Sequence, residues 1–405
     1  MKIMSFGHIP SWAGGRQESG LANVIYQLAK HGSEIPDAEV VLAATDCFVP
    51  LKKDGKLAIV GWTRNGLVGY IAKHPIRAVR SFLTLKGLKK RYPMSERFVG
   101  LYLKRIFMEK TLRSVHPQVL HLHGTSASWY LDLVPTDVKV AVTFHGMTGL
   151  DQNVVQHEVL FQMEHDVFHS SRVSEIFFIC TQLVSSFKEA YGDNGKKNQV
   201  IFNSYDNTQF YLEKDDATPL RSDREATVLS DVTTLCTVAS LSDLKGQLRV
   251  LSGLTLLPNR KNFKYFCIGG DSNGLAQKLS DYAKEHGIDF EYKGKMKPDE
   301  IRRELYRADY MIMPSSSEGF GLTYLEAIAC GIPVILPKDI PIAEEKGLIN
   351  EKNSILLDNC SPEAIARVLL HIKDWQFVHK DVASTLTGFS WDEITRLYVE
   401  AYKQL

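Results

Sequence analysis

The stretch from Tyr310 to Ile335 constrains the fold of this chain more than any other. It contains a short apolar strand, a polar loop that runs into Gly-Phe-Gly, an amphipathic helix and a second apolar strand. Gly331 stands where glycine commonly ends a helix, and Pro333 prevents the helix from continuing. Parallel neighbouring strands need a crossover connection of this kind, so the stretch predicts an α/β protein with a parallel sheet.

Two carboxylates lie in this stretch, Glu318 just before the helix and Glu326 two turns inside it. Gly319 and Gly321 let the backbone approach a ligand and free the first helical N–H groups, which favours phosphate oxygens. A carboxylate beside a phosphate site would repel the phosphate, so it needs a different partner. The hydroxyls of a sugar or a ribose can serve as that partner. The structural alternative is one solvent-exposed glutamate and one capping glutamate on an ordinary helix.

The run from Glu318 to Ile335, E-G-F-G-L-x-x-x-E-A-x-A-C-G-x-P-V-I, resembles the E-x7-E signature of retaining GT-B glycosyltransferases of family 4. The resemblance implies two Rossmann-like domains with parallel sheets that face each other across a cleft. It also implies that Glu318 meets the donor sugar, that Glu326 meets the ribose, and that loop amides meet the diphosphate. The donor-binding loop then comprises Gly319, Phe320, Gly321, Leu322 and Thr323.

Length and composition agree with a two-domain globular enzyme. A chain of 405 residues is too long for one ordinary core. Hydrophobic residues make up 44% and charged residues 23%, and the net charge of +1 does not favour nucleic acid as a partner. Six scattered cysteines without a C-x-x-C motif fit a reducing compartment. The first residues resemble a strand rather than a signal peptide, and no apolar run reaches about 18 residues. We therefore expect a cytoplasmic protein.

The resemblance also predicts where the domains divide. Residues 1–208, completed by a C-terminal helix at 388–405, form an acceptor-side domain, and residues 209–387 form the nucleotide-sugar domain. The polar run from Glu213 to Glu225 is the expected linker. The last helix should present one apolar face made of Ile394, Leu397, Tyr398 and Ala401.

The N-terminal region begins with a strand from Lys2 to Phe6, a loop with Gly14 and Gly15, and a helix from about Ser19 that Gly32 should end. Such a loop can direct backbone N–H groups at an anion, although a tight turn alone also needs glycine. In the resemblance, Gly14 and Gly15 face the donor diphosphate.

Histidines supply the next candidates. His145 follows a strand at 139–144, at the carboxyl edge where parallel-sheet sites lie. It matches the His-Gly of the family, which faces the donor sugar, and the alternative is a histidine that caps the strand. The pairs His121/His123 and His165/His169 have metal-like spacing, but no carboxylate or cysteine completes either in recognisable order. We therefore expect no metal and no cofactor besides the nucleotide-sugar substrate.

Three more segments carry the resemblance. Asn203 lies in V-I-F-N-S-Y-D, which is similar to V-I-x-N-G-V-D, and it joins the donor site. Lys245-Gly246 matches the end of G-R-L-x-x-x-K-G, whose arginine and lysine hold the diphosphate, but Ser240 replaces the arginine. Three interpretations stay open: Lys245 alone suffices to hold the diphosphate, Arg249 takes the place of the missing arginine, or the enzyme is weakened. Gly269 opens a G-x-G-like turn, and Met296 lies in the loop that meets the nucleobase.

Residues 64–113 are strongly basic, with thirteen Lys or Arg against Glu96 and Glu109. Apolar residues alternate with the cations, so part of this stretch should be an amphipathic helix. It is either a solvated helix face or, through residues 77–113, a surface for anionic lipid or an anionic acceptor.

The resemblance implies that this chain is a retaining hexosyltransferase. It would move a sugar from a UDP- or GDP-sugar to a glycan or lipid-linked glycan precursor, in surface polysaccharide synthesis at the inner face of the membrane. Lys245, Glu318 and His145 are the expected catalytic residues. The sequence offers no second carboxylate as a nucleophile, which favours front-face attack with the donor phosphate as base. A GT-B nucleotide-sugar epimerase and a weakly active or non-catalytic sugar-nucleotide-binding relative remain as alternatives.

Overall fold

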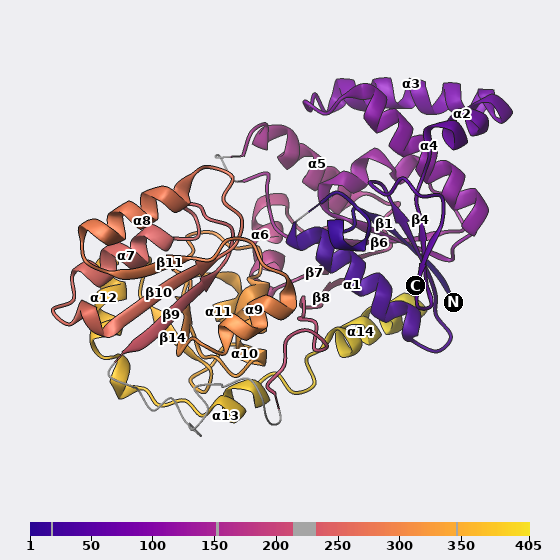
Figure 1. Cartoon of the computed structure of the whole chain (residues 1–405). Helices are drawn as coiled ribbons and strands as arrows, with labels where there is room; N and C mark the ends of the chain where they lie inside the picture. Colours follow the sequence, from indigo (N-terminus) through magenta and orange to yellow (C-terminus); the bar gives the residue numbers. More distant parts are fainter. Residues whose placement is uncertain (18, 151–153, 214–231, 346) are drawn as a thin grey trace. The chain divides into compact units, whose positions relative to one another are not determined.

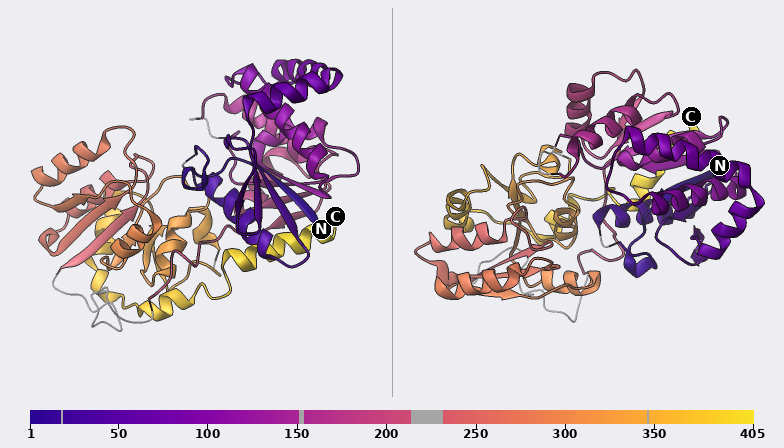
Figure 2. Two further views of the ribbon diagram at one scale, coloured as in Figure 1. Left: turned by 45° about the vertical axis from the view of Figure 1, so that its right-hand side comes forward. Right: turned by 90° about the horizontal axis from the view of Figure 1, so that it is seen from above.

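The computed structural model describes residues 1–17, 19–150, 154–213, 232–345 and 347–405. They form two compact units, one of Met1–Asn203 with Trp391–Leu405 and one of Ser204–Ser390 (Figure 1). Nearly all of the predicted linker lies outside the described residues. Helices cover both faces of the sheet in each unit, so the predicted α/β class is confirmed (Figure 2).

The described residues of the first unit form an eight-stranded sheet in the order β3-β4-β2-β1-β5-β6-β7-β8. Among the strand pairs described in this sheet, that of β3 with β4 is antiparallel and the others are parallel. The strand order turns back between β1 and β5, so the carboxyl ends of these two strands mark the switch point of the sheet. Its strands are β1 (Lys2–Gly7), β2 (Glu39–Ala44), β3 (Lys52–Asp54), β4 (Leu57–Val60), β5 (Val119–His123), β6 (Lys139–Phe144), β7 (Glu175–Phe178) and β8 (Asn198–Val200).

The helices of the first unit connect these strands, and the last helix of the chain packs against the first. They are α1 (Gly20–Glu34), α2 (Arg64–Lys73), α3 (Pro75–Arg91), α4 (Phe98–Val115), α5 (His157–His169), α6 (Thr181–Tyr191) and α14 (Trp391–Lys403). Short 3₁₀ turns are η1 (Ser11–Ala13), η2 (Gly124–Trp129) and η3 (Leu131–Leu133).

The second unit has a fully parallel sheet of six described strands in the order β11-β10-β9-β12-β13-β14. This is the doubly wound order, with its switch point between β9 and β12. The strands are β9 (Thr233–Val238), β10 (Phe263–Ile268), β11 (Asp289–Tyr292), β12 (Tyr310–Ile312), β13 (Val334–Pro337) and β14 (Ser354–Leu357). Residues of β9, β12 and β13 are buried throughout, as expected for strands covered on both faces.

The helices of the second unit are α7 (Gln247–Thr255), α8 (Leu275–Glu285), α9 (Pro298–Leu305), α10 (Leu322–Ala329), α11 (Pro341–Glu344), α12 (Pro362–Leu370) and α13 (His379–Ser384), with 3₁₀ turns η4 (Arg260–Asn262) and η5 (Ile372–Asp374). The predicted end of α10 is confirmed, because Gly331 has a φ of 79° just beyond it and β13 begins at Val334.

Two local predictions were wrong. Helix α1 continues past Gly32 to Glu34, because Gly32 is buried against Thr395 of α14 and Val40 of β2 and packing outweighs its tendency to end a helix. Leu397 is 49% exposed, whereas Tyr398 is buried. Adjacent residues on a helix point about 100° apart, and the buried face of α14 passes through Tyr398 rather than Leu397.

The basic stretch forms three helices, α2, α3 and α4. Its amphipathic character is clearest in α3, where Ala78, Ser81 and Leu85 are buried and most other positions are exposed. Among the described residues, no helix is both long enough and apolar enough to cross a membrane.

Candidate functional site

The loops after β9 and β12 leave adjacent strands at the switch point of the second unit. Ligands of doubly wound sheets bind at this position. The first loop carries Ser240 and Lys245, and the second carries residues 314–321. The amide of Ser316 donates to the carbonyl of Leu244 at 2.8 Å, so the two loops are joined directly.

Helix α10 begins at this edge because of its local sequence. Gly321 has a φ of 95°, and a Cβ there would lie 2.6 Å from the ring of Tyr324, so the position requires glycine. The Tyr324 hydroxyl donates to the carbonyl of Met313 at 2.7 Å and fixes the helix to the end of β12. Leu322 and Thr323 provide first-turn N–H groups, which have no acceptor within the helix and suit an anion.

Two of the predicted catalytic residues meet at this point. The Lys245 Nζ atom lies 2.6 Å from Oε1 of Glu318. The lysine side chain is 27% exposed and the glutamate side chain 7%, so the pair lies at the rim with its carboxylate largely shielded. The pair combines a cation with a hydroxyl-binding carboxylate, beside the N-terminus of α10.

Ser240 lies exposed at the end of β9, and its backbone is held by a residue that the sequence analysis missed. The fully buried Gln247 donates from Nε2 to the carbonyl of Ser240 at 3.1 Å and accepts from the amide of Ser242 at 3.3 Å. Gln247 follows Lys245-Gly246 at the first position of α7. A polar residue that opens a helix after this pair was the signal available in the sequence.

Arg249 is engaged elsewhere and does not replace the missing arginine in this conformation. Its Nη2 donates to the carbonyls of Leu244 at 3.0 Å and Pro314 at 2.7 Å. The guanidinium therefore joins the same two loops through their backbones.

Glu326 lies on the second turn of α10 and is only partly exposed. Burial raises its pKa to about 7, and the nearby Asp206 carboxylate contributes in the same direction. Among the described residues, no side chain or amide donates a hydrogen bond to its carboxylate. Such a carboxylate is suited to accept hydrogen bonds from a ligand.

The loops after β10 and β11 lie next to each other. The amide of Gly269 donates to the carbonyl of Gly294 at 2.9 Å, and the Tyr292 hydroxyl donates to the carbonyl of Gly269 at 2.9 Å. Met296 is partly exposed in the second of these loops. The structure thus brings together two of the segments predicted to bind the donor, the turn at Gly269 and the loop of Met296.

In the first unit, Gly14 and Gly15 close a turn after β1. Their amides donate to the carbonyls of Ser11 at 3.1 Å and Pro10 at 3.0 Å. A Cβ on Gly15 would lie 2.0 Å from the carbonyl oxygen of Ile9, so close packing alone requires this glycine. The role predicted for both glycines at the diphosphate stays a prediction.

Asp46, which the sequence analysis did not select, holds the same loop. Its two carboxylate oxygens accept the amides of Ile9 at 3.0 Å and Arg16 at 2.8 Å.

His145 ends β6 as predicted and is linked to a second histidine. Its Nε2 lies 3.0 Å from Nδ1 of His123, whose Nε2 lies 3.5 Å from the hydroxyl of Ser5. The Nδ1 atom of His145 is buried without a hydrogen-bond partner among the described residues. Burial lowers the pKa of His145 to about 3, so the imidazole is neutral at physiological pH.

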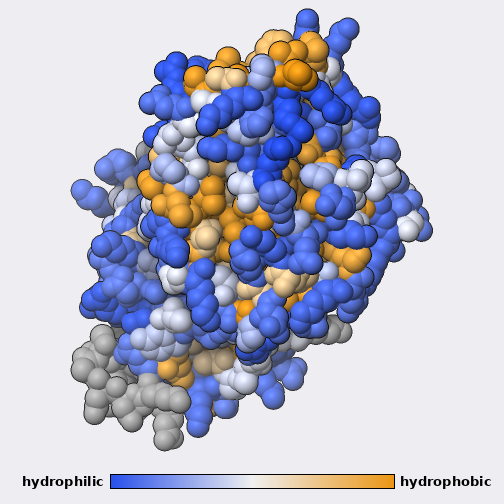
Figure 3. Space-filling model, turned by 90° about the vertical axis from the view of Figure 1, so that its right-hand side faces the viewer, coloured by the Kyte–Doolittle hydropathy of each residue, from blue (hydrophilic) through white to orange (hydrophobic). Residues whose placement is uncertain are grey.

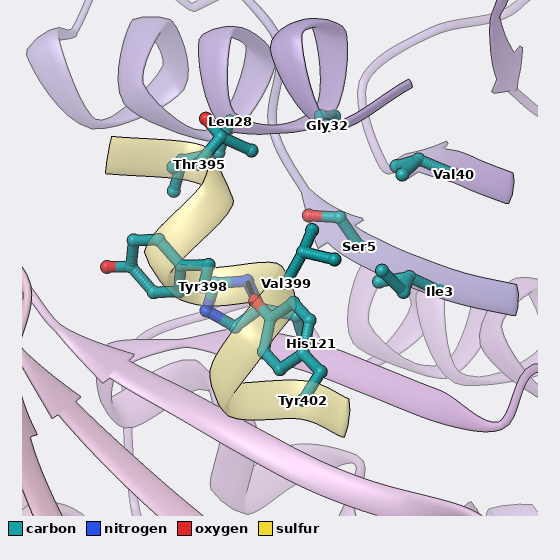
Figure 4. A pocket seen from close by; sticks show the side chains of 11 residues that line it. Ile3, Ser5, Leu28, Gly32, Val40, His121, Thr395, Tyr398, Val399 and Tyr402 are labelled. Atoms are coloured by element: carbon teal, nitrogen blue, oxygen red, sulfur yellow. Dashed lines mark hydrogen bonds between the residues drawn. The ribbon is translucent and has the colours of Figure 1, made fainter. Parts of the chain in front are cut away.

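His121 is engaged inside the first unit. Its ring nitrogens lie 2.7 Å from the Thr143 hydroxyl and 2.8 Å from the Tyr402 hydroxyl on α14. It also lines a cavity of about 20 Å³ between α1, α14 and the sheet (Figure 4). A cavity of this size holds about one water molecule, so it is no sugar site.

Two further expectations concern single residues and metals. Asn203 is buried at the end of the first unit, and its side-chain carbonyl has no hydrogen-bond partner among the described residues. His165 and His169 contact Asp166 and the carbonyl of Tyr191. In the described part of the chain, no three His, Cys, Asp or Glu residues cluster as metal ligands would.

Comparisons with known proteins agree with this geometry. Residues 221–379 match the family model of glycosyl transferases group 1. The D-inositol 3-phosphate glycosyltransferase of Corynebacterium kroppenstedtii is 28% identical over 218 residues, which are 50% of this chain and 47% of that protein. The O-antigen chain mannosyltransferase B of Escherichia coli is 31% identical over 169 residues, 38% of this chain and 42% of the relative. The chain thus spans about half the length of these curated relatives.

Among solved structures, Anabaena Alr3699/HepE in complex with UDP matches all of this chain and all of its own, with a TM-score of 0.71 and 15% identity. The structures that the chain resembles are GT-B glycosyltransferases, so the fold and the switch-point loops define a GT-B protein. The match of residues 221–379 to the glycosyl transferases group 1 model confirms the resemblance seen in the sequence.

Proposed function

We propose that this protein is a retaining glycosyltransferase that transfers a hexose from a UDP- or GDP-sugar to an acceptor hydroxyl. The observation that carries this proposal is the pairing of Lys245 with Glu318 beside the N-terminus of α10. A cation and open helical amides suit a diphosphate, and a shielded carboxylate next to them suits the hydroxyls of the attached sugar. The group 1 family match over residues 221–379 supports the same function.

In this proposal each residue has a stated role. Lys245 and the amides of Leu322 and Thr323 stabilise the departing diphosphate, which is electrostatic preorganisation. Glu318 orients sugar hydroxyls, and Glu326 accepts hydrogen bonds from the ribose. Gly269 and the loop of Met296 line the nucleotide. No step requires a metal.

We further propose front-face transfer. The bond from the anomeric carbon to the diphosphate oxygen breaks, and the acceptor oxygen bonds to the same face of that carbon. The acceptor proton passes to an oxygen of the leaving diphosphate. The product then keeps the anomeric configuration of the donor.

We propose that the first unit contributes His145, Asn203 and the turn at Gly14 and Gly15 to the reaction and presents the acceptor. We propose a glycan or lipid-linked glycan precursor as acceptor, because one curated relative is an O-antigen chain mannosyltransferase. Such an acceptor would place the enzyme at the inner face of a membrane, where surface polysaccharide precursors are extended.

A donor panel tests the function and separates it from the alternatives. The protein is incubated with UDP- and GDP-hexoses and with candidate acceptors. Release of nucleoside diphosphate with a glycosylated product supports the transferase. An epimerised donor would identify an epimerase. Tight nucleotide binding without turnover would identify a binding protein, which the exposed Ser240 in place of arginine makes the relevant alternative.

A further inference from the structure

The cations of residues 64–113 lie on α2, α3, α4 and their connections, and few of them are neutralised. Both acids of the stretch are already paired, Glu96 with Lys104 at 2.8 Å and Glu109 with Arg77 at 3.4 Å. Arg91 and Arg105 pair with Asp166 and Asp132. The other nine cations form no ion pair with any described residue, although Lys89 donates to the backbone carbonyls of Met94 and Glu96. They are Arg64, Lys73, Arg80, Lys86, Lys89, Lys90, Arg97, Lys110 and Arg113.

Helix α3 also presents apolar side chains to solvent. Ile76, Val79 and Leu83 are 84%, 57% and 60% exposed. Their three- and four-residue spacing places them on one face of the helix, opposite the buried positions Ala78 and Leu85. Figure 3 shows hydrophobic atoms gathered at the height of α2 and α3 in Figure 1. A helix face that only has to stay in water does not need three aliphatic side chains there.

The cations flank this apolar stripe. At 3.6 residues per turn, Lys86 lies on the outer side of Val79, and Arg80 lies on the side of Ile76 away from Val79. Lys90 continues the line of the stripe about two turns beyond Leu83. All three are exposed. Aliphatic residues at the centre with cations on both sides are the pattern of a helix that lies in the plane of a membrane interface.

We propose that α3 docks this protein on an anionic lipid bilayer, with Ile76, Val79 and Leu83 inserted among the acyl chains and Arg80, Lys86 and Lys90 at the head groups. An anionic polymer would use the cations and leave the aliphatic stripe exposed, whereas a bilayer takes both. The docking is independent of sugar transfer, because it is measured without donor or acceptor.

Sedimentation with vesicles tests the charge contribution. Vesicles of phosphatidylcholine alone are compared with vesicles in which one third is phosphatidylglycerol. The protein should bind only the anionic vesicles and should leave them at about 0.5 M salt, where charges are screened within a few ångströms. Each cation near the surface contributes about fivefold, so the triple variant R80S/K86S/K90S should bind about a hundredfold more weakly.

The second unit offers a matched control. Lys261, Lys278 and Lys284 are also exposed, and the variant K261S/K278S/K284S removes the same charge from elsewhere. It should bind as the unchanged protein does. Equal weakening by both triple variants would show a net-charge effect and overturn the proposal.

A second set of variants tests insertion. I76S/V79S/L83S should also lose vesicle binding, whereas L256S/L356S/L370S, which changes three exposed leucines of the second unit, should not. Thermal melting of every variant shows whether it is folded. An environment-sensitive dye is attached to Leu83→Cys. The protein also carries Cys360→Ser, because the other five cysteines are buried and should not react with the dye. The dye should report an apolar surrounding only with anionic vesicles.

Two outcomes would overturn membrane docking by α3. Protein that ignores anionic vesicles at low salt overturns the proposal. The proposal is also overturned if I76S/V79S/L83S still binds anionic vesicles and the dye on Leu83→Cys still reports water in their presence. That result would assign the cations to a soluble polyanion.

Discussion

The ammonium of Lys245 lies 2.6 Å from a carboxylate oxygen of Glu318, across two loops that leave adjacent strands at the switch point of the second sheet. The carboxylate is mostly shielded and the lysine partly exposed. The cation assigned to the diphosphate is therefore already shared with the carboxylate assigned to the sugar. Donor binding has to divide this cation between two anions, which couples the two residues energetically.

This coupling gives the first prediction. Glu318→Gln keeps the shape of the side chain and releases Lys245 from its anionic partner. Turnover should fall about a hundredfold, since one preorganised contact is lost, while affinity for UDP or GDP should stay equal or rise. Donor-release kinetics and titration calorimetry measure the two effects. The exposed Glu300→Gln on α9 is the control. A variant with unchanged turnover and weakened nucleotide binding would mean that Glu318 acts on the nucleotide rather than on the sugar.

Ser240 carries the second prediction. Ser240 is exposed beyond the end of β9. Arg249 is held by the carbonyls of Leu244 and Pro314, so neither position 240 nor position 249 directs a guanidinium at the expected diphosphate position. Ser240→Arg should tighten UDP or GDP binding by about tenfold or more, as a charge-assisted hydrogen bond adds about 1.5–3 kcal/mol. Calorimetry with the control Ser242→Arg measures the gain. Equal affinity in all three proteins would show that the position does not face the nucleotide.

The raised pKa of Glu326 predicts a pH dependence of stability. Its carboxyl titrates at about 7 in the folded chain and near 4.5 when unfolded, so the folded state holds more protons between these values. Stability should therefore fall as the pH rises from about 4.5 to about 7. Glu326→Gln removes this loss and should be more stable than the unchanged protein at pH 8, by on the order of 2 kcal/mol. Urea unfolding at pH 5 and pH 8 measures the difference, and an identical pH slope in both proteins would contradict the assignment.

The buried histidines predict the opposite slope. Burial lowers the pKa of His121 and of His145 to about 3, from about 6.5 in the unfolded chain. The unfolded state then binds more protons below pH 6.5, so stability should fall on acidification, by about 2 kcal/mol per group between pH 6.5 and 5. His145→Gln should flatten the acid limb of the unfolding curve, and the exposed His371→Gln should not. An unchanged acid limb in His145→Gln would show that this imidazole titrates normally.

Much of the second unit was predictable because its strands and helices are local. The apolar run at 263–268, the strand from Val334 and the helix end at Gly331 follow from patterning and turn chemistry alone. The end of α9 at Leu305 was not predictable in the same way. Asp309 must pair with Thr234 of β9, to whose carbonyl it donates and from whose amide its carboxylate accepts. That tertiary contact is invisible in a single sequence.

The candidate site was predictable where a motif fixes a backbone shape. Glu318 and Gly321 were identified in the E-x7-E-like stretch and Lys245 from its resemblance to the family's K-G pair, and the structure brings them to one edge. Gln247 and His123 were not selected, because their importance lies in the backbone or ring that each holds. Such contacts depend on distances between loops, and the one local sign of Gln247, a polar residue that opens a helix after Lys245-Gly246, does not say which groups it binds.

The direct test of the central claim is nucleotide binding at the Lys245–Glu326 edge. UDP and GDP are titrated into the unchanged protein, Lys245→Ala, Glu326→Ala and the control Lys261→Ala, whose side chain is exposed away from these loops, with affinity from calorimetry and melting temperature as a second readout. At about 100 times its dissociation constant, the bound nucleotide should add about 2.7 kcal/mol of stability. The account predicts that one of the two nucleotides binds, that Lys245→Ala and Glu326→Ala each weaken it about tenfold or more, and that Lys261→Ala does not. Failure of both nucleotides to bind, or binding that survives both site variants unchanged, would contradict it.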